Sequence, residues 1–489
     1  MKPDAALESL IQRYLDGVAT AQDLGELNGH LRSDAAARSQ FTEMLNLDSA
    51  LAANAAGWLA DQAGASAPQR VQRRPLVLPA RWLAAAACLA LAGAAWWWQG
   101  TNAVFATVHK GAGAEELAVG MPLRGEVHEI KNGAVEFITS RGARIVVEAP
   151  ALFQFESAQR LHLMRGRVAA EVPPAAKGFT VITPTGNAVD LGTKFGVDVP
   201  VGRAAEIHVF QGEVIAQPSG GRQRQSVRGG QAVTLQSTPG GEREFRSAAF
   251  IRSDELTALS AGLVAGQRAR AETGVSLLRH DPALIALLDF QSGVLPPGTY
   301  RVVQGRWPGS HAPEFVNTGD HMKIDVGGER EWPQLSLAAW VRLDRLGAPY
   351  QSLYHTDGWA GDKPGQVHWI INHDTTMRLA LQGNTVAPGT HDRFPDSRTP
   401  VLPEQGRWVH LAVVYDSVAH TVRFYLNGRF DREVRQETAF PARLGPAQIG
   451  NWNQQDRKLS GRVGELLILG RAMNDDEVRA LHAAGTPYL

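Results

Sequence analysis

Side chains that can bind metal ions gather in one stretch of the C-terminal half of the chain. Imidazole and carboxylate groups are the usual ligands of zinc and related transition metals. Their spacing matches no standard ligand pattern, and the only cysteine, Cys88, excludes a cysteine-based site. We therefore predict polar surface loops, with no metal site and no cofactor. The side chains in question are His355, Asp357, His368, His373 and Asp374.

Three tryptophans of the same region, Trp359, Trp369 and Trp452, are candidate carbohydrate-binding residues. The flat apolar face of indole can stack on a sugar ring, while its N–H remains free to donate a hydrogen bond. The competing interpretation places the same side chains in a hydrophobic core, where tryptophan is highly buried on average. The sequence leaves both interpretations open.

Catalytic motifs are missing from the sequence. It contains no Glu-x-Asp-x-x-Glu triplet of a sandwich glycosidase, no His-Glu-x-x-His, no Gly-x-Ser-x-Gly and no P-loop. We therefore predict no catalytic residue and no enzyme activity. The 49 basic residues cancel the 49 acidic residues, so no net charge directs the chain to nucleic acid.

The elements that position these residues are short strands. Gly (50) and Pro (27) are frequent, and apolar runs alternate with turn residues, which predicts a multidomain, mainly β chain. Residues 284–489 form the C-terminal β unit of this prediction. Its strands include Leu335–Val341, Trp408–Asp416, Val422–Leu426 and Gly461–Leu469, and Asn427-Gly428 is a strong hairpin turn.

This C-terminal series resembles the laminin-G-like, concanavalin A-like β-sandwich. The resemblance rests on Ser-x-x-x-Trp-Val, Trp-x-His-x-Ala-x-x-Tyr-Asp, Phe-Tyr-x-Asn-Gly, Ile-Gly-Asn and the closing Gly-x-x-x-Glu-x-x-Ile-x-x-Arg-Ala. Gly464 stands where the family often has aspartate, which weakens any expectation of calcium at that place. Such sandwiches serve many tasks, so the resemblance implies the fold, with a glycan or an envelope protein as a ligand class.

Residues 103–245 show a second β pattern of period two, with apolar and polar residues alternating. Asn132-Gly133, Arg141-Gly142 and Arg165-Gly166 are predicted hairpin turns. We expect Leu191, Phe195 and Val197 to point inward and Thr193 to bond backbone at a bend. All of these are fold residues rather than a chemical site.

An ordered series within residues 103–245 resembles the FecR domain. It consists of Thr-Pro-x-Gly from Thr183, Leu-Gly-Thr-x-Phe from Leu191, Val-x-x-Gly-x-Val from Val209, and Gly230-Gln231. FecR-type proteins are inner-membrane regulators with a cytoplasmic anti-sigma segment, one transmembrane helix and a periplasmic β-rich sensor part. The resemblance implies that the N-terminal segment binds an extracytoplasmic-function sigma factor.

A transmembrane helix is predicted over residues 81–99, in which Trp82–Trp98 carries no charge. Arg70, Arg73, Arg74 and Arg81 precede it, so the positive-inside rule puts the N-terminus in the cytoplasm and the later domains outside. A buried Ala-rich core helix is the alternative. The preceding residues 61–80, rich in Ala, Gln, Pro and Arg, form a linker with a basic end.

Residues 1–60 form a predicted cytoplasmic unit of three short amphipathic helices, with Thr20 as the N-cap of the second. A unit this small is marginal alone, and we expect it to use a partner. The candidate sigma-factor contacts are Leu10, Ile11, Tyr14, Phe41 and Leu45. The competing interpretation is that these residues form the core of the unit itself.

These segments together predict a single-pass regulator of FecR type in the bacterial inner membrane. Residues 246–283 are a helical connector between the two β units, which are predicted to be periplasmic and to sense or bind an envelope or glycan ligand. The alternative function is an envelope-anchored carbohydrate-binding or adhesion protein without sigma-factor regulation.

The predicted topology can be tested with reporters fused after Gly120. Alkaline phosphatase is expected to be active there, because it forms its disulfides only in an oxidising compartment. Green fluorescent protein at the same point is expected to be dark. A fluorescent fusion together with an inactive phosphatase fusion would contradict the topology.

Overall fold

The computed structural model describes most of residues 5–44 and of 103–489. The described ranges are 5–15, 19–34, 36–37, 40–42, 44, 103–220, 224–236, 243–291, 295–345, 349–359, 363–386, 394–452 and 457–489. The chain divides into two compact units, Met1–Ala94 and Ala95–Leu489. Among the described residues, no helix has the length and apolar character needed to cross a membrane. The predicted linker 61–80 and anchor 81–99 lie outside the described residues.

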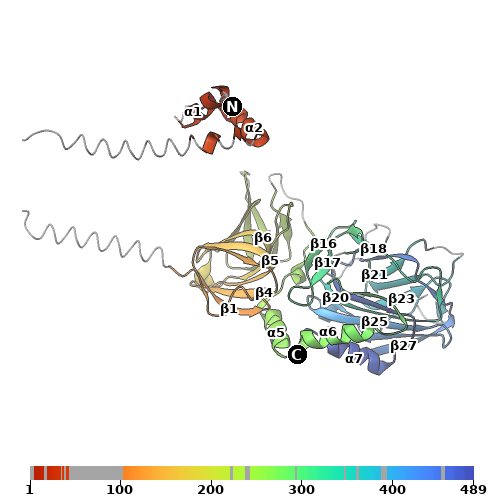
Figure 1. The fold of residues 1–489 in the computed structure, drawn as a ribbon. Coiled ribbons are helices and arrows are strands. Elements are labelled where there is room, and N and C mark those ends of the chain that lie inside the picture. The colour runs from red at the N-terminus through yellow and green to blue at the C-terminus, as the bar shows by residue number, and fades with distance from the viewer. Residues whose placement is uncertain are drawn as a thin grey trace, which may run out of the picture. The chain divides into compact units, whose positions relative to one another are not determined.

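The N-terminal unit contains α1 (Ala5–Leu15) and α2 (Ala21–Ser33), coloured red in Figure 1. The apolar faces of the two helices meet in a small core that includes Leu7 and Leu27. Thr20 and Asp23 form a capping box at the start of α2, because each side chain bonds the backbone N–H of the other residue. Of the three predicted amphipathic helices, the first two and the Thr20 cap are confirmed, while the segment of the third is described only in part.

The first β unit, residues 103–245, is built from one extensively paired sheet around one core. The longest strands of this sheet, β5 (Arg144–Ser157) and β6 (Arg160–Glu171), form an antiparallel ribbon at its centre. The main strand order is β12-β11-β8-β7-β6-β5-β4-β1-β2, with β3 added on β5 and β9 joining β10 to β6. The remaining strands are β1 (Ala106–Ala112), β2 (Pro122–Leu123), β3 (Val127–Ile130), β4 (Ala134–Thr139), β7 (Thr180–Thr183), β8 (Gly186–Asp190), β9 (Lys194–Val199), β10 (Glu206–Gln211), β11 (Glu213–Pro218), β12 (Gln225–Arg228) and β13 (Ala232–Thr234).

The three predicted hairpin turns of this unit have different outcomes. Arg141-Gly142 joins the antiparallel neighbours β4 and β5, so that prediction is confirmed. Asn132-Gly133 turns between β3 and β4, but each of these strands pairs with β5 rather than with the other. Arg165-Gly166 lies inside β6, so the prediction of a turn there was wrong. Gly166 has φ 110°, and a Cβ atom there would lie 2.6 Å from that of Ala151, which explains the glycine at this bend of the ribbon.

The Leu-Gly-Thr-x-Phe motif forms the turn between β8 and β9. Phe195 and Val197 point into the core as predicted, but Leu191 is 39 % exposed because it follows the last residue of β8. Thr193 donates its hydroxyl to the Asp190 carboxylate, not to the backbone as we expected. Burial of Asp190 raises the pKa of its carboxyl group, although hydrogen bonds from Thr193 and Gly192 oppose this shift.

The connector consists of two helices, α5 (Ser253–Val264) and α6 (Gln267–Leu278), where the sequence predicted one. Gly266, with φ 77°, breaks the helix between them. The residues before α5 and its Leu256 pack in one cluster with apolar residues of the first β unit, while α6 contacts α7 of the C-terminal unit. The connector therefore contacts both β units (Figure 1).

The sandwich, residues 284–489, has two main sheets facing each other across a core of apolar side chains. The nine-stranded sheet has the order β16-β17-β30-β20-β25-β26-β27-β24, with β14 on β30, and the six-stranded sheet the order β15-β18-β29-β21-β22-β23. The predicted β-sandwich is confirmed. The bounds are β14 (Leu284–Leu288), β15 (Gly298–Thr299), β16 (Arg301–Gln304), β17 (His311–Phe315), β18 (His321–Asp325), β19 (Glu331–Trp332), β20 (Gln334–Leu343), β21 (Tyr350–Thr356), β22 (Val367–Asn372), β23 (Met377–Leu381), β24 (Thr385–Val386), β25 (Trp408–Asp416), β26 (Thr421–Leu426), β27 (Arg429–Thr438), β28 (Ala442–Arg443), β29 (Pro446–Ile449), β30 (Gly461–Leu469) and α7 (Asp475–Gly485).

A buried network of ion pairs joins the first β unit and its connector to the sandwich. The side chains of these pairs are at most 20 % exposed. Such charges are stable inside a protein only when each has close partners of opposite sign. The pairs are Arg167–Glu314 at 2.9 Å, Arg246–Asp344 at 3.1 Å, Arg301–Asp198 at 2.9 Å, Arg342–Glu255 at 2.6 Å, and Arg462–Glu148.

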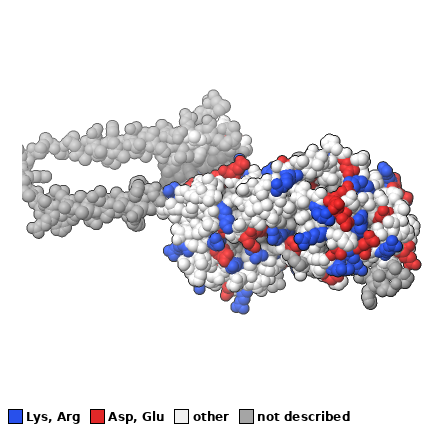
Figure 2. Space-filling view, turned by 90° about the horizontal axis from the view of Figure 1, so that it is seen from below, with Lys and Arg blue, Asp and Glu red and all other residues white. Residues whose placement is uncertain are grey.

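The carboxylates of this network are held in their charged form. Burial alone would raise the pKa of Asp198, but Arg167 and Arg301 outweigh it and hold that pKa well below its usual range. The pKa of Glu314 is likewise lowered, since Arg167, Arg301 and Arg462 outweigh its burial. On the visible face in Figure 2, by contrast, charged side chains of both signs lie intermixed without a wide patch of either sign.

Removing one carboxylate of this network should destabilise the Ala95–Leu489 unit. We expect Glu314→Gln to lower the free energy of unfolding by about 3–5 kcal/mol, because Arg167, Arg301 and Arg462 all lose a charged partner. Glu329→Gln, at an exposed position, is the control and should change it by less than about 0.5 kcal/mol. Urea unfolding measures both.

The effect should also depend on pH. The folded-state pKa of Glu314 is below its unfolded value, so its stabilisation is fully present above the unfolded pKa and is lost as pH falls. The difference between wild type and Glu314→Gln should therefore shrink below roughly pH 4. A difference of equal size at neutral pH and at the lowest pH that keeps the protein folded would contradict the assignment.

Candidate functional site

The five candidate sigma-factor contacts separate into core and surface residues. Leu10 and Ile11 are 5 % and 0 % exposed and belong to the core of the N-terminal unit. Tyr14 is 45 % exposed, and its ring lies 5.6 Å from that of the half-buried Phe41. Leu45 lies outside the described residues. Tyr14 and Phe41 are therefore the described candidates that can meet a partner without unfolding the unit.

The candidate sugar-stacking tryptophans do not form one site. Trp369 is 0 % exposed and packs in the sandwich core, so the prediction that it binds carbohydrate was wrong. The cause is the alternation of β22, in which Val367, Trp369 and Ile371 face the core. The competing interpretation as a core residue is correct for this tryptophan.

The other two tryptophans are half-buried and flank a histidine pair on the outer face of the six-stranded sheet. The His368 ring centre lies 3.8 Å from that of Trp359, 5.3 Å from that of Trp452 and 3.7 Å from that of His355. Burial, with a smaller contribution from Arg457, lowers the pKa of His368 to about 3. Both histidines are thus neutral rings packed among aromatic side chains.

No group of three potential metal ligands occurs in the part of the chain that the structure describes. His355 and His368 are neighbours in the register of β21 and β22, but Asp357 instead accepts a hydrogen bond from Gln448. Asp374 accepts bonds from Thr376 within its own turn. The prediction of polar surface loops was therefore wrong for His355 and His368, which are buried in β21 and β22, whereas Asp357 and Asp374 make local hydrogen bonds.

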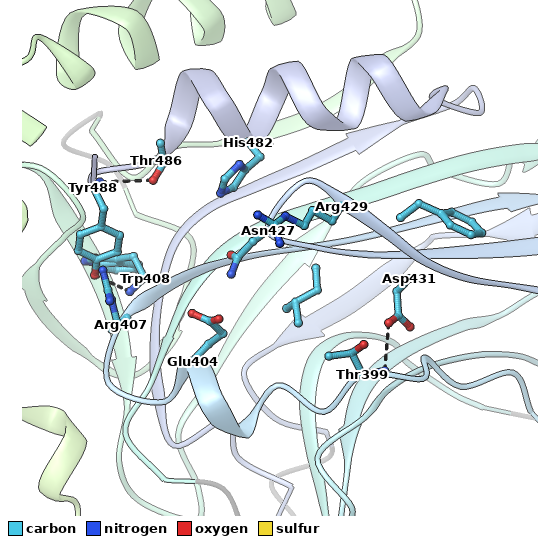
Figure 3. A pocket seen from close by; sticks show the side chains of 12 residues that line it. Thr399, Glu404, Arg407, Trp408, Asn427, Arg429, Asp431, His482, Thr486 and Tyr488 are labelled. Atoms are coloured by element: carbon cyan, nitrogen blue, oxygen red, sulfur yellow. Dashed lines mark hydrogen bonds between the residues drawn. The ribbon is translucent and has the colours of Figure 1, made fainter.

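A pocket of about 530 Å³ lies beside α7 at the nine-stranded sheet, and we refer to it as the α7 pocket. Figure 3 shows side chains from four segments converging on it: the loop after the 3₁₀ turn Leu402–Glu404, the β26–β27 turn, α7 and the C-terminal tail. The residues that line it are Thr399, Glu404, Arg407, Trp408, Leu426, Asn427, Arg429, Phe430, Asp431, His482, Thr486 and Tyr488.

The β26–β27 turn fixes one wall of the α7 pocket. Asn427 and Gly428 have φ 49° and 72°, as a tight hairpin turn requires, so the predicted Asn-Gly turn is confirmed. A Cβ atom at Gly428 would lie 2.6 Å from the Cβ atom of His482, so glycine lets α7 approach the turn. The Asn427 side-chain oxygen accepts from the His410 N–H at 3.0 Å, which leaves its NH₂ group for the pocket.

The C-terminal tail forms another wall. The Tyr488 hydroxyl accepts a hydrogen bond from the Trp408 N–H at 2.8 Å and donates one to Glu255 at 3.2 Å. The Arg407 guanidinium lies over the Tyr488 ring, 4.3 Å from its centre. Since Glu255 pairs with Arg342, this wall contacts the buried ion-pair network.

The α7 pocket contains charged groups that are not neutralised by neighbours. Within the described residues, Glu404, Arg407 and Arg429 make no ion pair. Asp431 differs, because its two oxygens accept the N–H groups of Arg398 and Thr399. Burial and the nearby Arg429 lower the pKa of His482, which is therefore a neutral imidazole at pH 7.

The charged residues of the α7 pocket carry no recognisable signal in the sequence. Glu404, Arg429 and His482 come from three separate segments, and no short motif links them. Trp408 and Asn427 do belong to sequence motifs of the concanavalin A-like resemblance, but they were interpreted there as a strand residue and a turn residue. These motifs indicate the β-sandwich fold, but they do not indicate a ligand.

The residue that departs from the family phrase, Gly464, also has a structural explanation. A Cβ atom there would lie 2.9 Å from the Trp408 ring, so a side chain would displace that tryptophan. The adjacent Glu465 pairs with Arg306 at 2.8 Å. The carboxylate of Glu465, which remains at the place where the family can bind calcium, is therefore paired with an arginine.

Two family models match separate parts of the chain. Residues 126–215 match the FecR protein family, and residues 317–479 match the concanavalin A-like lectin/glucanases superfamily. The chain thus carries a FecR domain within its first β unit and a concanavalin A-like domain within its sandwich. No curated protein sequence matches the chain.

Several solved structures are similar to parts of the chain at low identity. A candidate anti-sigma factor from Parabacteroides distasonis is 14 % identical over 25 % of this chain and 62 % of its own, with a TM-score of 0.22. The chain thus spans less than two thirds of that protein. Domain 4 of the arabinanase AbnA from Geobacillus stearothermophilus, solved with arabinotriose, is 20 % identical over 40 % of this chain and 97 % of its own, with a TM-score of 0.31.

A candidate carbohydrate-binding protein from Bacteroides ovatus is 17 % identical over 35 % of this chain and 46 % of its own, with a TM-score of 0.26. TM-scores of this size carry no argument about function.

Proposed function

Because the chain joins a FecR domain to a concanavalin A-like domain, we propose that it is a single-pass regulator of the bacterial inner membrane. In this proposal the N-terminal helices bind an extracytoplasmic-function sigma factor in the cytoplasm. Residues 81–99 cross the membrane. The FecR domain and the sandwich lie in the periplasm, where the sandwich binds a glycan or another envelope ligand.

The observation that carries this proposal is a continuous set of contacts from the α7 pocket to the FecR domain. Tyr488 bonds Glu255, Glu255 pairs with Arg342, and Arg342 donates to the Ala248 carbonyl at 2.6 Å. The next carbonyl, that of Ala249, accepts from Arg167 at 3.1 Å and from Arg462 at 3.0 Å. A ligand that moves the C-terminal tail would therefore act on groups that also hold the FecR domain.

In this proposal the chain binds its ligand and does not catalyse a reaction on it. A glycosidase needs two carboxyl groups that can exchange protons and reach the scissile bond. In the α7 pocket Asp431 is engaged by two backbone N–H groups, which leaves Glu404 as the carboxylate free of such bonds. An envelope-anchored adhesion protein with the same sandwich is the second candidate, since the α7 pocket supports glycan binding with or without a sigma factor.

Sigma-factor binding separates these two candidates. We expect residues 1–80 to retain an extracytoplasmic-function sigma factor in a pull-down against the purified sigma factors of this class from the source bacterium. Tyr14→Ala and Phe41→Ala should each weaken binding by about 1–3 kcal/mol, or roughly 5- to 150-fold, because both rings lie at the surface of the unit. Asn28→Ala, at an exposed position of α2, is the matched control and should bind as wild type does.

Circular dichroism distinguishes loss of contact from loss of fold. Tyr14→Ala should keep the helical signal, whereas Leu10→Ala should lose it, because Leu10 is a core residue of a small unit. Unchanged sigma-factor binding by a folded Tyr14→Ala/Phe41→Ala double variant would show that this surface is wrong. No binding by the wild-type segment would favour the adhesion protein.

A further inference from the structure

We propose that the α7 pocket binds a saccharide that carries a carboxylate group. This inference rests on the proposed function, since it names the ligand class and the site of the exported sandwich. It also moves that site away from the tryptophans that the sequence suggested.

The size of the α7 pocket suits part of an oligosaccharide. Its volume of about 530 Å³ lies within the range of roughly 300–1,000 Å³ that small-ligand sites occupy. Its lining combines polar groups that converge from separate segments with a few apolar side chains, as a site for a polar ring compound requires (Figure 3).

Two guanidinium groups make a carboxylate the best match. Arg407 and Arg429 line the pocket and make no ion pair among the described residues. An unpaired guanidinium offers a planar fork of donors that fits a carboxylate with two parallel hydrogen bonds. His482, which faces the same space, is neutral because burial and Arg429 lower its pKa, so it adds one donor and one acceptor without a further charge.

The remaining polar groups suit sugar hydroxyls. Glu404 can accept from hydroxyl groups, since no cation of the described chain occupies its carboxylate. The Asn427 NH₂ group can donate to them, since only its oxygen is engaged by His410. Phe430 is 50 % exposed at the edge of the pocket and offers a ring face to the apolar side of a sugar.

The tryptophan cluster on the other sheet is less suited to this task. The Trp359 ring packs on His368 with 3.8 Å between ring centres, and Trp452 lies under the Arg457 guanidinium at 4.6 Å. One face of each indole is therefore already covered by a neighbouring side chain. In the α7 pocket, by contrast, Glu404 and Arg429 make no ion pair with any residue that the structure describes.

Calorimetric titration of the full chain, purified in a mild detergent, tests the proposal. The probes are trigalacturonic acid, 3′-sialyllactose and neutral maltotriose, so that a uronic acid and a sialic acid are compared with an uncharged sugar. We expect at least one acidic probe to bind at least about tenfold more tightly than maltotriose, because each guanidinium–carboxylate pair adds a charge-assisted interaction.

Substitutions in the α7 pocket test whether the acidic probe binds there. Arg429→Gln should weaken the acidic probe by about tenfold or more, and Arg429→Lys should restore part of the affinity because the charge returns without the planar fork. Glu404→Gln should weaken binding as well. Arg435→Gln, at an exposed position of β27 outside the pocket, is the matched control and should bind as wild type does. Equal thermal midpoints would show that the variants are folded.

The outcomes separate this inference from the proposed function. Equal affinity for acidic and neutral probes, or unchanged affinity in folded Arg429→Gln and Glu404→Gln, would overturn the α7 pocket as a carboxylate site while glycan binding stands. Loss of binding in Trp452→Ala alone would move the site to the tryptophan cluster. No binding of any saccharide, acidic or neutral, would overturn both this inference and glycan sensing by the sandwich.

Discussion

Buried ion pairs between the FecR domain and the sandwich hold together the two β domains of the Ala95–Leu489 unit. Moving an arginine or a carboxylate out of water costs several kcal/mol, which is recovered only when every partner is in place. Arg167 and Glu314 come from different domains, as do Arg462 and Glu148. Partial separation of the domains would leave these charges without their partners. The two domains therefore dock in one defined orientation and open, if at all, as a whole.

The connector and the C-terminal tail also bond to residues of this ion-pair network. Arg342 and Arg462 donate to the carbonyls of Ala248 and Ala249, so the short segment before α5 is held from the sandwich side. The tail is held through Tyr488, whose pKa burial and Glu255 raise, so its hydroxyl stays protonated and able to donate. A pocket that includes Tyr488 is thus linked by consecutive contacts to the domain interface, although it lies on the sandwich alone.

The sequence was informative where structure depends on neighbours along the chain. The strand Gly461–Leu469, the Asn427-Gly428 turn and the Thr20 cap follow from local patterns, and the structure has them at the predicted places. It was uninformative where residues from distant segments meet. The partners Arg462 and Glu148 are separated by most of two domains, and nothing local marks them as partners.

The errors have the same physical origin. Gly166 looked like a turn because glycine permits positive φ, but the same freedom serves a bend within a long ribbon. Trp369 looked available for sugar because tryptophan can stack, but its place in the alternation of β22 decides that it faces the core. The α7 pocket escaped prediction because its charged groups come from separate segments that only the tertiary fold brings together.

Hydrogen exchange of core amides, followed by mass spectrometry, tests most directly whether the two domains open as one unit. The buried interface predicts that amides of β6 in the FecR domain and of β25 in the sandwich exchange with the same free energy of opening, and that Glu314→Gln lowers both equally. Exchange of β6 at a clearly lower free energy than β25, with only one of them affected by the substitution, would contradict this account.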